Sequence, residues 1–449
     1  MDNNIDSGAA YMHFADKKKK LLSEFNSIQG EVAIGKQTSN LFRPRNIKTK
    51  KINVRNFNKV LSIDTVSMIA DVEGMITYED LVNETLKYGF MPAVVPQLKS
   101  ITIGGAVSGL GIEASSFKYG LVHETVEELE VLTGKGDITV CNAKKNQDLF
   151  SGFPNSYGTL GYVLRLKVRL VKVKSFVKIM HKKFSDPEKY FKEIERLCRQ
   201  KEDINFIDGT VFSISEMYIT TAEFVDAAPF LSDYMYMKIY YKSIREKQVD
   251  YLTVKDYIWR WDTDWFWCSR NFGVQNPAIR LFAGPFLNSK TYWKIMNFAN
   301  KSKTMKKAVS LFKPRTESVI QDVEIPVNNA PGFLKFFNSE IRITPIWVCP
   351  TKLYKNVKYD LYEMDQGVLY INFGFWDGVI TTEEDGYYNK KIELMVEKLK
   401  GKKSLYSTSY YTEKKFWELY NKKAYDTLKK KYDPKGKLKN LYEKAVLRK

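Results

Sequence analysis

The stretch Gly104-Gly105-Ala106-Val107-Ser108-Gly109-Leu110-Gly111 is the most informative part of the sequence. Its glycines leave backbone N–H groups free to converge on an anion, as they do in phosphate-binding nests. The spacing does not fit the dinucleotide fingerprint G-x-G-x-x-G, and no P-loop motif G-x-x-x-x-G-K-[ST] occurs in the sequence. A tight structural bend would explain the same glycines, so the stretch alone leaves both interpretations open.

The segments around this stretch carry a resemblance to a known family. Ile112–Gly120 follows at once, and Asp148–Phe150 and Ser156–Gly161 come later in the same order as in flavoproteins. Together they resemble the flavin-binding domain of the vanillyl-alcohol oxidase superfamily, and within it most closely the delta-24 sterol reductase family. Phe206–Gly209 and Tyr432–Pro434 extend the resemblance, which covers the chain from about Ile34 to its end.

The resemblance implies an α+β protein with several parts. Residues 31–174 would form a two-subdomain FAD-binding domain of the PCMH type, after a polar amino-terminal segment at residues 1–30. Residues 175–400 would form an α+β substrate domain, in which helices flank an antiparallel sheet. A basic helical segment at residues 401–449 would pack back on the flavin domain.

Residue patterns predict individual elements within this plan. Leu164–Leu170 alternates apolar residues with Arg and Lys, which predicts a strand with one face exposed to solvent. Thr77 is expected to cap a helix, because acidic residues follow it in the first turn. We also expect strands over Tyr234–Tyr241 and Ile341–Val348, and a continuous helix over Glu413–Lys431.

The resemblance also implies which residues bind FAD. The loop from Gly35 to Asn40 would hold the pyrophosphate together with Gly104–Gly111, although Lys36-Gln37-Thr38 stands where many superfamily members have glycines. No His lies in that first loop, and His123 is more simply a polar residue at a strand start, so we expect non-covalent FAD. The expected cofactor residues are Gly35, Lys36, Gln37, Thr38, Ser39, Asn40, Gln97, Thr102, Gly104, Gly105, Gly109, Gly111, Ser115, Ser116, Gly120, Val126, Gly158, Thr159 and Gly161.

Reduction of a carbon–carbon double bond by a flavin needs a hydride and, on the opposite side, a proton donor. The expected donors are Gln321 and Asp322 in one strand, Tyr370 and Asn372 in another, and Tyr410 or Tyr411 before a terminal helix. Each also has a purely structural interpretation, as a core aromatic or a capping residue. A Lys typical of the related sugar oxidases is absent from the segment around Ser407–Tyr411, which disfavours that substrate type.

Aromatic residues gather at Tyr257–Trp261 and again at Trp265–Trp267. Such rings suit a membrane interface or a lipid entrance. They suit the core of the substrate domain equally well, and this second interpretation is favoured.

The chain is strongly basic, with 71 Lys and Arg against 52 Asp and Glu over 449 residues, a net charge of +19. An excess of this size is typical of proteins that bind nucleic acid or anionic membranes, so both are candidate partners. From Tyr387 to Lys449 we count 19 basic and 7 acidic residues, but Lys dominates, and scattered Lys more often solvates a surface. We therefore expect no nucleic-acid partner.

The few Cys and His are scattered, so neither a metal centre nor a disulfide framework is indicated. With no secretory signal or spanning stretch, we expect a cytoplasmic protein that reaches membranes peripherally. The resemblance implies an FAD-dependent reductase of a sterol or isoprenoid-like lipid, with NADPH as the reductant. The alternatives are an FAD-linked oxidase or dehydrogenase of an alcohol or sugar, and a basic binding protein that keeps the fold without the chemistry. The oligomeric state stays open.

Overall fold

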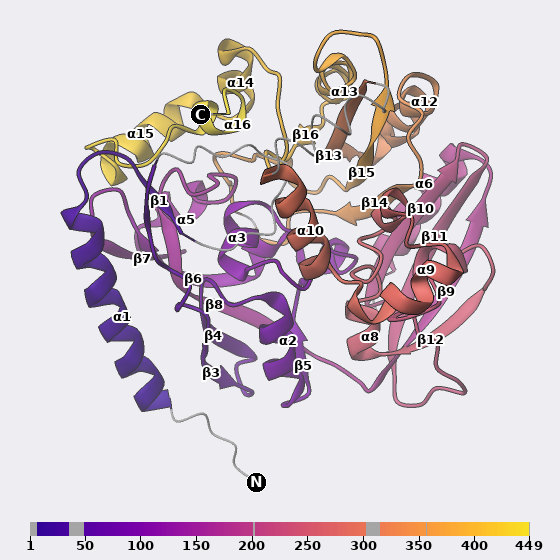
Figure 1. The fold of residues 1–449 in the computed structure, drawn as a ribbon, viewed down its shortest axis with the longest axis horizontal. Coiled ribbons are helices and arrows are strands. Elements are labelled where there is room, and N and C mark those ends of the chain that lie inside the picture. The colour runs from indigo at the N-terminus through magenta and orange to yellow at the C-terminus, as the bar shows by residue number, and fades with distance from the viewer. Residues whose placement is uncertain (1–6, 36–48, 201–202, 302–314, 356, 449) are drawn as a thin grey trace.

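Two antiparallel sheets, one on each side of the molecule in Figure 1, organise the computed structural model. It describes residues 7–35, 49–200, 203–301, 315–355 and 357–448. Among these residues the first sheet has the order β3-β4-β8-β6-β7, with β5 beside β8. Its strands are β3 (Val60–Asp64), β4 (Ile69–Glu73), β5 (Phe90–Pro92), β6 (Val126–Leu132), β7 (Ile138–Asn142) and β8 (Tyr162–Lys172).

The second sheet has the order β12-β9-β11-β10-β14-β15-β13-β16 in the described part of the chain. Its strands are β9 (Phe176–Phe184), β10 (Phe206–Ser213), β11 (Glu216–Val225), β12 (Val249–Thr253), β13 (Thr316–Pro326), β14 (Ile346–Thr351), β15 (Tyr370–Ile380) and β16 (Lys402–Lys403). A short parallel pair stands apart, formed by β1 (Val32–Ile34) and β2 (Lys50–Ile52).

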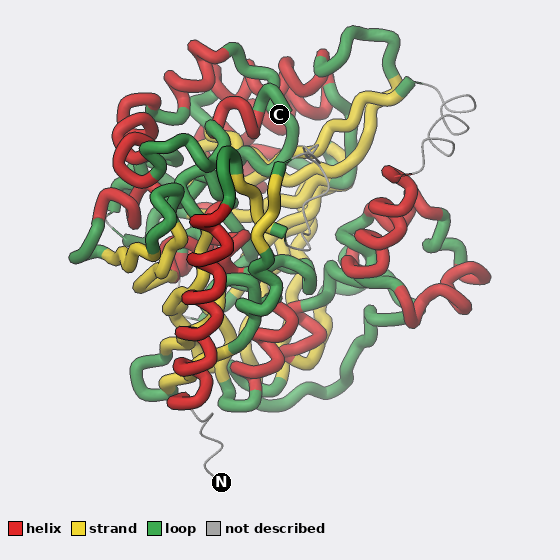
Figure 2. The backbone as a smooth tube through the Cα atoms, turned by 60° about the vertical axis from the view of Figure 1, so that its left-hand side comes forward, coloured by secondary structure: helices red, strands yellow, loops and turns green. Residues whose placement is uncertain are grey.

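Helices cover both sheets and fill the space between them (Figures 1 and 2). Those in the first half are α1 (Ser7–Ser27), α2 (Tyr78–Leu86), α3 (Ile103–Ser108), α4 (Ser116–Tyr119), η1 (Val122–Thr125), α5 (Gln147–Gly152) and α6 (Pro187–Arg199). The middle has α7 (Tyr240–Ser243), α8 (Val254–Ile258), η2 (Cys268–Phe272), α9 (Pro277–Ala283), η3 (Gly284–Phe286) and α10 (Ser289–Lys301). The rest are η4 (Val327–Asn329), α12 (Ala330–Glu340), α13 (Tyr387–Lys398), α14 (Glu413–Leu419), α15 (Lys422–Tyr432) and α16 (Leu441–Ala445).

The helix that Thr77 was expected to cap is present as α2. The Thr77 side chain accepts a hydrogen bond from the Asp80 N–H at 3.2 Å, and the acidic first turn complements the helix dipole. This helix packs beside β5, and its first residue Tyr78 donates its N–H to the Ile101 carbonyl at 2.8 Å, just before the segment that contains Gly104.

The strand β8 forms with the predicted alternation, but its charged face is only partly exposed: the Lys167 side chain is 41% exposed and the Arg165 side chain 14%. Helix α1 lies over this face, and Tyr11 donates to Asp71 at 2.7 Å. Arg165 on β8 also binds Asp71, with Nε 2.7 Å from Oδ1, and Lys18 pairs with Glu130 at 2.6 Å. Alternation along a strand identifies its polar face but does not show whether another element covers that face. Here α1 covers part of it and supplies a complementary charge.

Three other predicted elements need correction. Residues 234–239 form no strand: the segment is irregular, Tyr234 packs edge-on against Tyr240, and Met237 and Lys238 are exposed before α7 begins. The strand expected from Ile341 begins only at Ile346, after Arg342 adopts a positive φ of 62°. The long terminal helix is broken at Asn421, which adopts a φ of 51° and caps α15 by accepting from the Ala424 N–H.

The aromatic cluster is part of the core. Trp259, Trp261 and Trp267 are among the largest fully buried side chains, and Trp265 and Phe266 are also buried. The core interpretation is therefore confirmed, and the lipid-facing interpretation is wrong for these rings.

The carboxy-terminal helices return to the first sheet, where α15 lies beside α5. Tyr432 donates to Asp148 at 2.9 Å, and Lys429 donates to the Thr159 carbonyl at 2.9 Å. Part of the terminal Lys excess thus binds protein groups. None of the helices in the described part of the chain combines the length and the apolar character that a membrane crossing requires.

Candidate active site

Close backbone packing shapes the glycine-rich stretch on and after α3. The Gly104 N–H donates to the Gly74 carbonyl at 2.9 Å, and a Cβ at Gly104 would lie only 2.6 Å from that oxygen. Packing within the protein thus requires the glycine here, as the bend interpretation supposed. The same packing brings α3 against the end of β8, where Val163 lies.

The next predicted cofactor segment, Ile112–Gly120, is also tightly held. The Ser115 hydroxyl donates to the Ala93 carbonyl at 2.7 Å, and the Ser116 hydroxyl accepts from the Glu113 N–H at 3.1 Å. Gly120 has a φ of +75°, and the Glu124 carboxyl lies directly over it, so a side chain would be both strained and obstructed. Both serines keep oxygen lone pairs available after these bonds.

The third predicted segment meets the first at Tyr157. Its N–H donates to the Ser108 carbonyl and its hydroxyl donates to the Gly109 carbonyl, both at 3.1 Å. Gly158 follows with a φ of +78°, and the Thr159 hydroxyl donates to the Ser156 carbonyl at 2.8 Å. The structure therefore joins two loops that are about fifty residues apart in the chain.

The residues at these loops fit a polar cofactor. The hydroxyl of Ser156 and the side-chain carbonyl of Asn155 are buried without a hydrogen-bond partner, directly before Gly158. Buried polar atoms are normally paired, so such orphans indicate a missing polar group. Small residues and orphaned polar atoms are what a closely held diphosphate cofactor would need.

The other expected cofactor residues are placed as follows. Gly35 donates its N–H to the Ile52 carbonyl at 2.7 Å, while Lys36 to Asn40 lie outside the described residues. Gln97 binds the Glu113 carboxyl, and Thr102 precedes α3 in an extended conformation. Val126 begins β6, and its carbonyl accepts from Lys355 at 3.2 Å.

On the second sheet, polar side chains converge at Asp322 of β13. Asn372 on β15 donates to the Asp322 carboxyl at 3.3 Å, and a Cβ at Gly374 would be 2.6 Å from its Oδ1. The Tyr406 hydroxyl also hydrogen-bonds Asp322 and accepts from the Trp376 indole N–H at 2.9 Å. We call Asp322, Asn372, Trp376 and Tyr406 the Asp322 cluster.

A second buried carboxyl stands beside this cluster. Glu324 lies two residues from Asp322 on the same face of β13, and Tyr362 hydrogen-bonds it. Burial raises the pKa of Asp322 to about 7 and the pKa of Glu324 to about 8. Both groups can therefore hold a proton near neutral pH, as a general acid must.

Tyr157 connects the two halves of the site. Besides clamping the glycine-rich loops, it contributes to the raised pKa values of Tyr406 and Tyr362, though burial contributes most to both shifts. Tyr157 is thus near Tyr406 and Tyr362, the two tyrosines that hydrogen-bond the Asp322 and Glu324 carboxyls.

The remaining predicted donors are placed elsewhere. Gln321 lies on the opposite face of β13 from Asp322 and donates to Asn389 of α13 at 2.6 Å. Tyr370 donates to Asp365 at 3.2 Å at the end of β15. The Tyr410 ring lies 5.3 Å from the Arg448 guanidinium, and Tyr411 packs on Tyr420.

A buried ion cluster joins the cofactor segment to the second sheet. Arg260 donates to Glu113 at 3.3 Å and to Asp208 of β10 at 2.9 Å, and all three side chains are almost completely buried. Burial raises the pKa of Glu113 to about 7 in spite of the cation beside it. The Arg260 guanidinium also lies 4.0 Å from the Tyr257 ring centroid.

His123 and a surface hollow lie outside the Asp322 cluster. His123 is buried in η1, its Nδ1 has no hydrogen-bond partner, and burial lowers its pKa to about 3. The hollow, of about 580 Å³, opens between residues 339–343, 378–380 and 387–391 at the edge of the second sheet. It contains none of the expected site residues.

Comparisons with known proteins agree with this geometry. Residues 28–142 match the family model described as "FAD binding domain". The chain is 26% identical to human Delta(24)-sterol reductase over 418 residues, covering 88% of this chain and 78% of that protein. The chain is an FAD-linked oxidoreductase.

A second relative and a solved structure extend this similarity. Delta(24)-sterol reductase of Arabidopsis thaliana is 24% identical, with 92% of this chain and 79% of the relative covered. The crystal structure of 6-hydroxy-D-nicotine oxidase from Arthrobacter nicotinovorans has a TM-score of 0.56 at 14% identity, covering 95% of this chain and 88% of the oxidase. The oxidoreductase therefore shares its α+β fold with this oxidase and resembles sterol reductases over most of its length.

Sequence reasoning missed several residues of the site. Tyr406, Trp376, Glu324 and Tyr362 join the Asp322 cluster or its surroundings but stand in no motif. For these residues the sequence offers no signal. The separate ion cluster had one: Arg260 is a charge within a largely aromatic run, which indicates a buried ionic partner.

Proposed function

We propose that this oxidoreductase reduces a carbon–carbon double bond of a sterol or isoprenoid-like lipid, with NADPH as electron donor. Two kinds of observation support this: the similarity to proteins named Delta(24)-sterol reductase, and the partly buried carboxyl of Asp322, which can hold a proton near neutral pH. Reduced FAD, when bound, supplies a hydride to one carbon of the double bond. A proton delivered to the other carbon completes two C–H bonds and balances the charge.

Asp322 is the proposed proton donor. The raised pKa of its carboxyl is the single observation on which the proposed chemistry depends. Its raised pKa keeps the carboxyl protonated up to about pH 7, whereas an ordinary Asp would be ionised. The Asn372 and Tyr406 side chains fix its orientation. The Trp376 indole holds the Tyr406 oxygen, so the whole cluster is restrained before the substrate arrives.

The apolar surroundings of the Asp322 cluster favour a lipid substrate. Trp376 lies 4.4 Å from the Phe266 ring and 6.5 Å from the Trp347 ring, measured between centroids. Rings at this position exclude water and offer flat apolar contacts. A polar sugar would gain little from such a surface.

FAD is proposed to bind non-covalently through the loops at Gly104–Gly111, Ser115–Ser116 and Gly158–Gly161. Ser156 and Asn155, with their unpartnered buried oxygens, are additional groups for it. Acid precipitation of the holoprotein should release the yellow colour into the supernatant. Yellow colour retained in the pellet would show a covalent bond.

The decisive experiment mixes the FAD-loaded protein with NADPH and then with a sterol alkene under anaerobic conditions. We expect NADPH to bleach the flavin and the alkene to restore its absorbance, with stoichiometric loss of the double bond. Bleaching by a polyol instead would support the oxidase alternative.

Asp322→Asn tests the proton donor separately. We expect reoxidation of the reduced flavin by the alkene to slow by about 100-fold or more, while bleaching by NADPH is unchanged. In the wild type this step should slow as the pH rises above about 7, because Asp322 then loses its proton. Glu223→Gln, at an exposed ion pair of β11, is the control and should behave as wild type. Equal reoxidation rates in Asp322→Asn and wild type would exclude Asp322 as the donor.

A further inference from the structure

Large apolar side chains are exposed along a single stretch that spans α9, η3 and α10. Phe282 is 79% exposed and Phe286 is 68% exposed, and three aliphatic side chains nearby are about half exposed. We call this set the apolar ridge; its members are Ile279, Leu281, Phe282, Phe286 and Ile295. In Figure 2, α9 and α10 project from the side of the molecule.

The ridge is exposed although its base is firmly anchored. Arg280, on the inner side of α9, is buried and binds Asp264 through both terminal nitrogens, at 2.7 and 2.9 Å. On α10, Tyr292 stacks on Trp265 with 5.9 Å between ring centroids and also contacts Phe272. On α9 the exposed Phe282 thus lies opposite the buried Arg280, while on α10 the exposed Ile295 lies one turn after the anchoring Tyr292.

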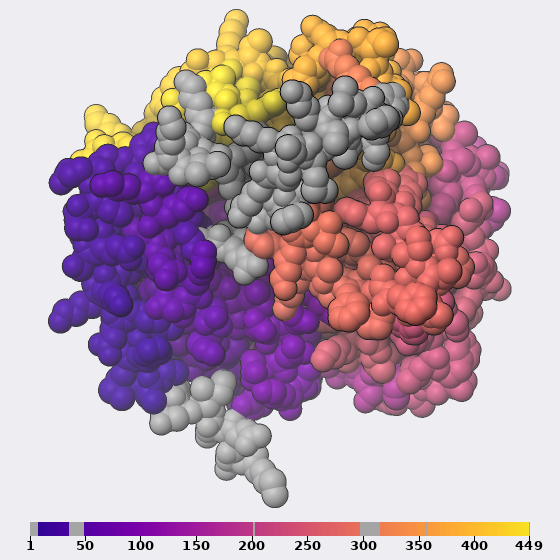
Figure 3. All heavy atoms as spheres, in the orientation of Figure 1, coloured from indigo at the N-terminus to yellow at the C-terminus, as the bar shows by residue number. Residues whose placement is uncertain are grey.

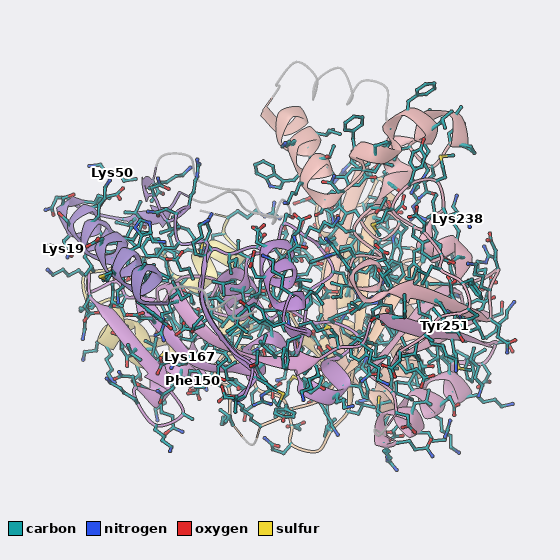
Figure 4. The ribbon with its side chains drawn as sticks, turned by 90° about the horizontal axis from the view of Figure 1, so that it is seen from below. Lys19, Lys50, Phe150, Lys167, Lys238 and Tyr251 are labelled. Carbon is teal, nitrogen blue, oxygen red and sulfur yellow. The ribbon has the colours of Figure 1, made fainter. Side chains whose placement is uncertain are left out.

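The stretch of sequence that carries the ridge is basic. From Trp265 to Thr316 the sequence contains ten Lys or Arg and no Asp or Glu. Lys290 and Lys294 are exposed on α10, and Lys290 pairs with Glu79 of α2. Lys238 is also exposed, in a segment joined to α9 by a hydrogen bond from Arg280 to the Lys238 carbonyl at 3.3 Å (Figure 4).

Aromatic contacts connect the base of the ridge to the proposed reaction centre. Phe266, next to Trp265, lies 4.4 Å from Trp376, and the Trp376 indole holds the Tyr406 hydroxyl. The segment also forms part of the face shown in Figure 3, where it is open to solvent.

We infer that the apolar ridge docks on the surface of an anionic lipid bilayer, with Phe282 and Phe286 entering the interface and Lys238 and Lys294 facing the headgroups. Helices that lie in a membrane interface combine exposed aromatic and aliphatic residues with lysines in this way. Several large exposed apolar side chains on one short stretch of chain are uncommon on a protein surface without a binding role.

Charge favours this occupant over the others. A second copy of the chain would bring the same lysines face to face, and the stretch offers no acidic residue to pair with them. Nucleic acid would use the lysines, but the protruding phenylalanines would add nothing to contacts with phosphates. An anionic bilayer matches both the apolar and the basic groups.

Vesicle co-sedimentation of the full-length protein tests the inference without any turnover. We expect binding to vesicles containing about one third phosphatidylserine, and weaker binding to pure phosphatidylcholine. Phe282→Ser/Phe286→Ser should lower the partition coefficient by about tenfold or more, because two exposed rings no longer enter the interface. Lys238→Gln/Lys294→Gln should lower it by roughly fivefold per lysine, and only for the anionic vesicles.

The control replaces apolar residues of similar exposure elsewhere. Val66→Ser/Leu394→Ser changes side chains that are 92% and 67% exposed and lie outside the ridge, and it should bind like wild type. Equal vesicle binding of the Phe282→Ser/Phe286→Ser variant and wild type would overturn the inference. The inference would also be wrong if this variant bound vesicles like wild type but lost a dimer, or lost oligonucleotide binding, that the wild type shows. Flavin absorbance is recorded on the same samples with and without NADPH. Loss of vesicle binding can therefore be distinguished from loss of the proposed flavin reaction.

Discussion

The cofactor loops and the Asp322 cluster are built in opposite ways. In the loops, neighbouring residues in the sequence act together, and backbone packing at Gly104 and Gly120 fixes the shape. In the Asp322 cluster, side chains come from β13, its paired neighbour β15 and the segment after β16, so strand pairing and side-chain hydrogen bonds bring together residues far apart in the sequence. Backbone shape leaves a motif in the sequence, whereas a hydrogen-bonded cluster of scattered side chains does not.

Arg260 links these two regions, and removing it should have the largest effect. Arg260→Met leaves Glu113 and Asp208 buried without their cation, which should lower the free energy of unfolding by about 3–5 kcal/mol. Without the cation the pKa values of both carboxyls rise further. The loss should therefore be greater at pH 8 than at pH 6, where the carboxyls more readily take up a proton. Chemical denaturation at the two pH values measures it.

Arg245→Met is the matched control for this prediction. Arg245 pairs with Glu216 at 2.7 Å, but its side chain is 53% exposed, so the cost should stay below about 1 kcal/mol at either pH. Arg260→Lys keeps the charge and should be intermediate, which provides a measurable variant if Arg260→Met does not fold. A pH-independent loss in Arg260→Met would show that packing, and not charge, dominates at this position.

Gly104→Ala tests the cofactor loops alone. The new Cβ would meet the Gly74 carbonyl oxygen, and because that contact is with backbone, α3 must shift. We expect a loss of about 1–3 kcal/mol in the free energy of unfolding and weaker FAD binding by titration. Gly332→Ala, in α12 where a Cβ meets no atom within 4 Å, should be neutral or stabilising and bind FAD normally. Unchanged FAD affinity in Gly104→Ala would show that the segment containing Gly104 does not help to bind the cofactor.

The sequence allowed prediction of those features that depend on consecutive residues. The glycine-rich stretch, the strand over Leu164–Leu170 and the helix after Thr77 all follow from spacing and capping. The break at Asn421 could also have been predicted, since Asn tolerates a positive φ and often caps a helix. The irregular segment over Tyr234–Tyr241 could not, because its β-prone residues are held by aromatic packing to distant rings.

The reaction side could be predicted only in part. Asp322 and Asn372 were among the expected donors, and the structure brings them together. Tyr406 was missed because its neighbours Tyr410 and Tyr411 look equivalent in the sequence, and only the path of the chain after β16 distinguishes them. The ridge could not be predicted from its apolar residues, because the more aromatic Trp-rich segment before it is buried and the sequence alone does not distinguish the two; only the lack of acidic residues from Trp265 to Thr316 sets the stretch apart.

Tyr406→Phe should have the smallest effect and the sharpest signature. The hydroxyl of Tyr406 lowers the pKa of Asp322 by hydrogen bonding, so its removal should raise that pKa further above its ordinary value. Flavin reoxidation by the alkene should slow by about tenfold or less, because Asp322 loses one orienting bond but remains protonated. The fall in rate at high pH should move to higher pH than in wild type. Tyr251→Phe, at a strand position outside the site, should change neither the rate nor its pH dependence (Figure 4). A shift of the pH profile in the opposite direction would contradict the hydrogen bond from Tyr406 to Asp322, and with it the assembly of the cluster around that carboxyl.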